Sequence, residues 1–200
     1  MLHAPREKAV SGSLRKSILY GRAQTLLFLG MNQAALRAFQ DVVREVPARA
    51  EAWSVLGFLH AQRGEMSEAV TAFEKALALK GDDSALFFNA GFATQRAGDH
   101  ERAMALFRRA IALDPKLDRA WYGLGLSLAH VGRHEEAITK FREAVRLQPF
   151  NPYAGYHLAA VLYKLGRRDE VHAEYLRVKD FDPKISALMR REFAIEDPDV

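Results

Sequence analysis

The sequence predicts an all-α protein built from five helix–turn–helix repeats and a C-terminal capping helix. The first observation behind this prediction is a period of 34 residues that runs through most of the chain. The second is the composition, which is rich in alanine, leucine, arginine and glutamate and poor in valine, isoleucine and threonine, as helical proteins are. Cysteine is absent, which excludes disulfides, thiolate catalysis and cysteine-based metal sites.

The period is clearest in three residue types that recur in register. Glycine recurs at Gly30, Gly64, Gly98, Gly132 and Gly166, an aromatic ring at Phe39, Phe73, Phe107, Phe141 and Tyr175, and alanine at Ala35, Ala69, Ala103 and Ala137. Self-similarity at a fixed period is the signature of a repeat protein. Five ungapped repeats follow, which are residues 16–49, 50–83, 84–117, 118–151 and 152–185.

Each repeat is predicted to hold two helices. The Gly30 series marks the end of the first helix, where a residue in the left-handed conformation commonly stands. An amphipathic run such as EEAITKFREAVRL then forms the second helix. Proline, as at Pro149, ends it, because proline cannot continue a helix. Glycine inside a first helix, as at Gly125, leaves room for a close approach of the second helix and its large ring.

The two ends of the chain fall outside the repeats. Residues 1–15 are expected to be partly disordered, with helix beginning near Leu14. Residues 186–194 (SALMRREFA) are expected to form a capping helix that covers the edge of the fifth repeat with Leu188, Met189 and Phe193. Residues 195–200 (IEDPDV) are expected to be a frayed acidic tail.

The repeats resemble tetratricopeptide repeats (TPRs), whose pattern is W-x2-L-G … A-x3-F … P. The fourth repeat matches it at Trp121, Leu124, Gly125, Ala137, Phe141 and Pro149. Arg22 departs from the pattern in the first repeat, where it replaces the leucine, and Gly155 departs in the fifth, where it replaces the aromatic residue. The resemblance implies a right-handed superhelical solenoid whose first helices line a concave groove that binds another protein or a peptide.

Candidate groove residues occupy the stripe of each first helix that repeat packing does not require. Many of them are large and apolar, and a contiguous apolar patch usually marks an interaction site. The predicted groove consists of Tyr20, Ser54, Phe58, Phe88, Asn89, Phe92, Arg96, Arg119, Tyr122, Leu126, Tyr153, Tyr156, His157 and Lys164. Its basic residues outnumber its acids, so the expected ligand is an apolar segment with some negative charge.

No catalytic residue, metal site or cofactor is predicted. Ser127 in GLSLA resembles a nucleophile elbow only in its letters, because that elbow requires a strand before the serine. His130 and His134 have the spacing of metal ligands, but Gly132 between them ends the helix, so they are interpreted as surface histidines. His60 is interpreted as a half-buried histidine with a satisfied hydrogen bond.

The leading functional prediction is a non-catalytic scaffold or adaptor that binds a segment of another protein. One alternative is a secretion or assembly chaperone that holds an apolar client in the same groove. Another is a structural protein that self-assembles through its oppositely charged ends. Family members that bind heat-shock chaperone tails use a clamp of lysine, asparagine and arginine, of which only Asn89 and Arg119 are present here.

The location and the partner class follow from charge and hydropathy. A formal net charge of +4 is too small and too evenly mixed to indicate nucleic acid. The apolar run TLLFL is too short for a secretory signal or a membrane span. The sequence therefore predicts a cytoplasmic protein with no nucleic-acid or membrane partner and with weak self-association through its termini.

Overall fold

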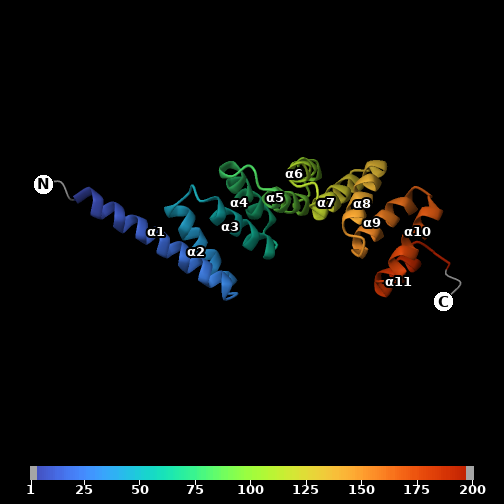
Figure 1. Ribbon diagram of the computed structural model, residues 1–200, viewed down its shortest axis with the longest axis horizontal. Coiled ribbons are helices and arrows are strands. Elements are labelled where there is room, and N and C mark those ends of the chain that lie inside the picture. Colours follow the sequence, from blue (N-terminus) through green and yellow to red (C-terminus); the bar gives the residue numbers. More distant parts are fainter. Residues whose placement is uncertain (1–3, 197–200) are drawn as a thin grey trace. The chain divides into compact units, whose positions relative to one another are not determined.

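The computed structural model describes the backbone of residues 4–196 and the side chains of residues 12–196. Within that range the chain forms eleven helices and no strand, which confirms the all-α prediction (Figure 1). The helices are α1 (Ala4–Phe28), α2 (Asn32–Glu45), α3 (Ala50–Gln62), α4 (Met66–Leu79), α5 (Ser84–Arg96), α6 (His100–Leu113), α7 (Asp118–His130), α8 (His134–Leu147), α9 (Pro152–Lys164), α10 (Arg168–Lys179) and α11 (Pro183–Glu192). None of the helices in residues 4–196 is long and apolar enough to cross a membrane.

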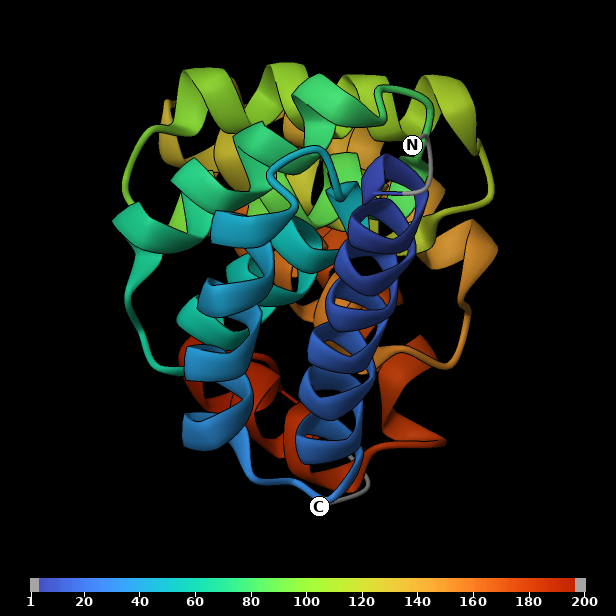
Figure 2. The same ribbon diagram turned by 90° about the vertical axis from the view of Figure 1, so that its left-hand side faces the viewer.

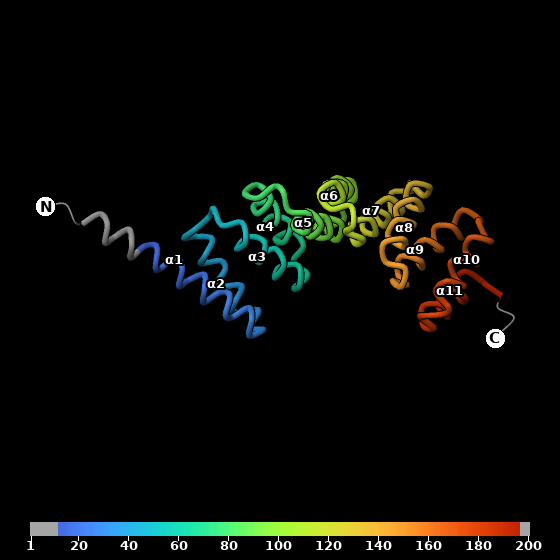
Figure 3. The backbone as a smooth tube through the Cα atoms, viewed as in Figure 1, coloured from blue at the N-terminus to red at the C-terminus, as the bar shows by residue number. Residues whose placement is uncertain are grey.

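The helices gather into two compact units, Met1–Ala93 and Thr94–Val200, which divide within α5. In the N-terminal unit α1 packs on α2, α2 on α3, and α3 on α4; Figure 2 shows α1 and α2 side by side. In the C-terminal unit each helix from α6 to α10 packs on the next one along the chain. Figure 3 traces the backbone through α9, α10 and α11. Consecutive packing of this kind is what repeats that contact only their neighbours produce.

The glycine series ends the first helices as the sequence predicts. Gly30, Gly64, Gly98, Gly132 and Gly166 all have positive φ, between 69° and 94°. The amide after each glycine donates to a carbonyl five residues back, as from Met31 N to Leu26 O at 3.0 Å. These bonds satisfy carbonyl groups that the end of a helix leaves without partners.

The aromatic series forms the core of the helix pairs. Phe39, Phe73, Phe107 and Phe141 are buried, and Tyr175 takes the same place in the fifth repeat. The glycines of the first helices lie against these rings. A Cβ atom added to Gly57 would stand 2.7 Å from Cδ1 of Phe73. The close approach of the paired helices therefore depends on a glycine opposite a phenylalanine.

The fifth repeat replaces the missing aromatic residue with an arginine. In the second and fourth repeats the indole nitrogen of the first-helix tryptophan donates to a proline carbonyl: Trp53 to Pro47 at 2.8 Å and Trp121 to Pro115 at 2.9 Å. Pro149, at the end of the fourth repeat, is the equivalent proline for Gly155 of the fifth repeat, which has no side chain. Arg177 Nη1 donates to the Pro149 carbonyl instead, at 2.5 Å. A Cβ atom on Gly155 would lie only 2.1 Å from Arg177 Nη2, so the guanidinium occupies the space of the absent ring.

Arg177→Ala should lower the free energy of unfolding of the C-terminal unit by about 1–3 kcal/mol, because it removes a hydrogen bond from a charged donor and leaves a hollow beside Gly155. Chemical denaturation of the full chain measures this change. The double variant Arg177→Ala with Gly155→Trp restores the tryptophan arrangement of the other repeats and should recover part of the loss. Equal stability of the single variant and the wild type would show that the guanidinium has no such role.

Both ends differ from the prediction in where their helices begin. Helix α1 begins at Ala4, well before the expected start near Leu14, and it continues without a break into the first repeat. Helix α11 begins at Pro183 rather than at residue 186, because Asp182 caps it by accepting a hydrogen bond from the Ile185 amide at 2.9 Å. Met189 and Phe193 are buried against the fifth repeat, and Leu188 is half-buried. The expected fraying concerns mainly residues 197–200, which lie outside the described residues.

The outer face of α1 explains the arginine in the first repeat. Ile18 is 61% exposed, whereas Ala52, its equivalent one period later, is fully buried. Arg22 lies on the same helix and is exposed, whereas the equivalent Leu56 is buried. A leucine is therefore needed at this position only where another helix covers it.

Candidate peptide-binding surfaces

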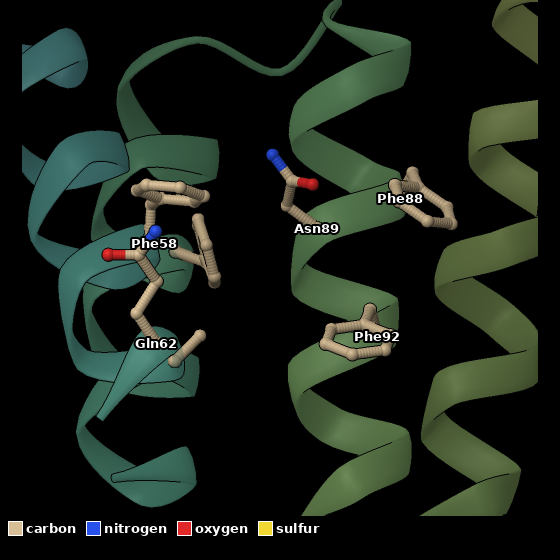
Figure 4. Close-up of a pocket in the computed structure, with 7 residues that line it drawn as sticks. Phe58, Gln62, Phe88, Asn89 and Phe92 are labelled. Carbon is tan, nitrogen blue, oxygen red and sulfur yellow. The ribbon is translucent and has the colours of Figure 1, made fainter. Parts of the chain in front are cut away.

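An apolar cavity of about 350 Å³ opens in the N-terminal unit between α3 and α5. Phe58, Phe88 and Phe92 line it, and the core residue Phe73 contributes to its wall. Figure 4 shows Phe58 and Gln62 projecting from α3, and Asn89 and the two other labelled rings projecting from α5. Phe58 and Phe92 are 47% and 42% exposed. This exposure of large rings costs free energy in water, which a ligand would recover by covering them.

The polar groups of the cavity are two amides. Asn89 and Gln62 line it together with the rings, and the lining includes no charged side chain. Amide groups both donate and accept hydrogen bonds, so they can pair with the main chain of a peptide. The cavity therefore suits an apolar side chain with its adjoining backbone. The sequence prediction included Asn89 but missed Gln62, which lies at the end of α3.

Two other predicted residues of the N-terminal unit are less open than expected. The Tyr20 ring packs edge-on against the core residue Phe39, with ring centroids 6.0 Å apart. The Arg49 guanidinium covers it at 4.0 Å from the ring centroid. Ser54 is half-buried. Tyr20 thus packs between α2 and the residue before α3 and presents little apolar surface to a ligand.

In the C-terminal unit, Tyr122 and His157 pack against one another and against the core. Their ring centroids are 5.7 Å apart, and each lies about 6 Å from that of Phe141 (6.0 and 6.1 Å). Burial raises the pKa of the Tyr122 hydroxyl and lowers the pKa of the His157 imidazole, because it disfavours the charged form of each. Leu126 is half-buried. Tyr122 and His157 therefore join adjacent first helices more than they face solvent, and Leu126 is only partly open.

The open part of the predicted surface in the C-terminal unit is mixed in character. Tyr153, at the start of α9, is 57% exposed. Lys164, Arg119 and Arg96 are exposed as well. An exposed ring and several cations are compatible with a ligand that carries both apolar and acidic groups.

Tyr156 is covered by the chain's own C-terminal segment. Its hydroxyl donates to the Glu192 carboxylate, and its ring lies 5.6 Å from that of Phe193. The Glu192 carboxylate raises the pKa of the Tyr156 hydroxyl to about 12. Tyr163 lies on the other side of Phe193, with ring centroids 5.4 Å apart. The sequence indicated Phe193 as a residue of the cap and of a tail that could enter the groove of a neighbouring copy, but it did not predict this contact within one chain.

The residues considered for chemistry have structural partners. Ser127 is buried, and its Oγ accepts a hydrogen bond from the Gln95 amide at 2.7 Å. His60 Nδ1 lies 2.7 Å from Glu65 Oε2. His130 stacks on His100, with ring centroids 3.7 Å apart. No cluster of three or more potential metal ligands occurs among the residues with described side chains.

The comparisons with known proteins agree with this architecture. The family described as "Tetratricopeptide repeat" matches residues 20–84 and 90–152, which together are more than half of the chain. The chain belongs to the tetratricopeptide repeat family. TPR proteins are in general scaffolds for protein–protein interaction, and the match indicates no enzyme family.

Individual TPR relatives are distant in sequence. A 55-residue stretch is 33% identical to the formate-dependent nitrite reductase complex subunit NrfG of Escherichia coli O157:H7, and this match spans 28% of each chain. The crystal structure of MamA superposes with a TM-score of 0.77 at 22% identity, over 82% of this chain and 96% of that one. YrrB, described as a TPR protein with an unusual peptide-binding site, superposes with a TM-score of 0.75 at 20% identity, over 84% of this chain and 88% of that one. At these identities the likeness establishes the shared TPR fold.

Stability of the C-terminal unit should fall when the pH drops below about 6.5, the ordinary pKa of histidine. Burial lowers the pKa of His157, and burial together with the nearby His130 lowers the pKa of His100. The folded chain then binds fewer protons than the unfolded chain, so stability rises with pH and is lost as the pH falls toward the lowered values. Urea unfolding at pH 7 and pH 5 measures the difference. His157→Phe should reduce it, and an unchanged pH dependence in that variant would contradict the assignment.

Proposed function

We propose that this chain is a non-catalytic adaptor that binds an apolar, partly acidic segment of another protein through the exposed faces of its first helices. The apolar cavity beside Phe58 and Phe92 is the observation that carries the proposal. Both rings are large and exposed and line the same cavity, although packing of the helix pairs does not require aromatic residues there. YrrB, which shares the fold, is described as having a peptide-binding site, which supports a similar use of this chain.

The ligand inserts an apolar side chain into the cavity while its backbone bonds to Asn89 and Gln62. On the C-terminal unit, taken by itself, exposed cations such as Lys164 suit an acidic ligand segment. The apolar anchor is thus assigned to the N-terminal unit and the charge preference to the C-terminal unit. The anchor contributes most of the affinity, because desolvated aromatic contacts are the usual centre of an interface, whereas exposed charges contribute less.

Phe58→Ala should weaken binding of the partner by about 1–3 kcal/mol, as expected for a central anchor. A partner captured from native extract, identified and purified, gives the affinity by calorimetry. Leu79→Ala is the matched control, because Leu79 is also an exposed apolar residue of the N-terminal unit (46%) but lies at the end of α4, outside the cavity. Equal affinities of Phe58→Ala and wild type would overturn the proposal for this cavity.

A chaperone role is the second candidate, because the same two exposed rings suit an aggregation-prone client. The two functions differ in what happens to the partner when the chain is absent. A client should aggregate or be degraded without its chaperone, whereas the partner of an adaptor should stay soluble. Expression of the identified partner with and without this chain therefore decides between them.

A further inference from the structure

Helix α9, the first helix of the fifth repeat, carries a second aromatic site, and a segment of the same chain occupies it. Tyr156 and Tyr163 lie about two helical turns apart on α9, and the Phe193 ring contacts both, with centroid distances of 5.6 and 5.4 Å. Phe193 is only 6% exposed, although it lies just beyond the end of α11. The slot is thus an aromatic site occupied by a phenylalanine.

Polar contacts hold the residues on either side of that ring. The Tyr156 hydroxyl donates to the Glu192 carboxylate. Arg168 Nη1 donates to the Phe193 carbonyl at 3.2 Å, and its guanidinium stacks on Tyr163 at 4.0 Å from the ring centroid. An acidic side chain, an aromatic ring and a main-chain carbonyl are therefore each recognised by a separate group. This is the set of contacts expected of a site for a short acidic–aromatic peptide.

Helix α11 has an anchor of its own besides Phe193. Met189 is completely buried, and Asp182 caps the start of the helix. After the helix the backbone turns through Ala194, whose φ of 50° lies in the left-handed region that disfavours a residue with a Cβ atom. Release of this segment would break the bond from Ile195 N to Arg190 O that closes the turn, but it would relieve the left-handed conformation of Ala194 and leave Met189 to hold the helix.

We infer that Tyr156, Tyr163 and Arg168 form a binding site for an acidic–aromatic segment of a partner protein, and that residues 192–196 are its built-in competitor. This inference rests on the proposed peptide-binding function and adds a ligand class and a regulatory element to it. Because the competitor is tethered beside the slot, its effective concentration is high, so a free ligand binds the intact chain weakly. A partner gains the site when its own segment displaces Phe193.

The test uses the full chain and a labelled peptide REFAIE, which copies residues 191–196. Phe193→Ala empties the slot, so this variant should bind the peptide about tenfold or more tightly than wild type. The peptide REAAIE, which lacks the ring, is the matched ligand control. Tyr163→Ala added to Phe193→Ala should abolish the gain.

Two results would overturn the inference. The first is equal binding of REFAIE by wild type and Phe193→Ala. The second is loss of α11 in Phe193→Ala, seen as reduced helicity or protease cleavage near residue 183, which would make Phe193 a structural cap rather than a displaceable ligand. The proposed function is tested separately in the same preparations. If partner binding still depends on Phe58, the proposed function holds even when this inference fails.

Discussion

Phe141→Ala should lower the free energy of unfolding by about 3–5 kcal/mol, the largest effect of any substitution considered for this chain. The Phe141 ring is fully buried in α8 and packs against Tyr122 and His157 of the two adjoining first helices. Truncation therefore leaves a hollow between three helices, and rigid neighbours close such a hollow only in part. Denaturant unfolding followed by circular dichroism measures the change.

Tyr153→Ala is the matched control for this prediction. Tyr153 lies in the same repeat junction but is 57% exposed. Its removal should change stability by less than about 1 kcal/mol, since surface substitutions usually have small effects. If the two variants lose similar amounts of stability, the aromatic series does not form the core as described.

Gly125→Leu should destabilise the chain by about 1–3 kcal/mol or more, because it adds volume where none is free. A Cβ atom on Gly125 would already stand 2.7 Å from Cε1 of Phe141, closer than such atoms approach. The α7–α8 pair would have to move apart to admit a leucine. Thermal unfolding monitored at the helical signal reports the loss.

Gly12→Ala controls for the general effect of replacing a glycine inside a helix. Gly12 lies within α1, and a Cβ atom there would meet nothing within 4 Å. This change should be neutral or stabilising by up to about 1 kcal/mol, since alanine favours helix more than glycine does. The double variant Gly125→Leu with Phe141→Ala should lose less than the sum of the single variants, because the leucine can enter the space of the ring.

Much of the fold was predictable because its determinants are local and periodic. The helix ends follow from glycines that adopt a left-handed conformation, as at Gly132, and from prolines that cannot continue a helix. The core follows from one aromatic residue per repeat, as at Phe107, since a residue that recurs in register takes the same environment each time. The start of α1 was placed too late, because its first residues lack the periodic pattern on which the prediction relied.

The open parts of the predicted surface could not be identified in the same way. Tyr20, Phe58 and Tyr156 belong to similar positions of first helices, yet Arg49 covers the first and Phe193 covers the third, while Phe58 stays open. The covering residues lie beside other helices, Arg49 just before α3 and Phe193 just after α11, and the repeat pattern does not specify them. The groove as a binding site therefore stays a proposal, with the Phe58 cavity as its best-supported part.

The sequence alone determined the repeat, its helix ends and its aromatic core, because each depends on residues within one 34-residue period. Only the tertiary structure decided which side chains make the contacts at positions that depart from the repeat pattern. Arg177 supplies the hydrogen bond that a tryptophan makes elsewhere, and Phe193 fills a slot that the sequence left open. Both outcomes depend on contacts between residues far apart in the sequence, and a long side chain can reach such a contact from a position that the period does not mark.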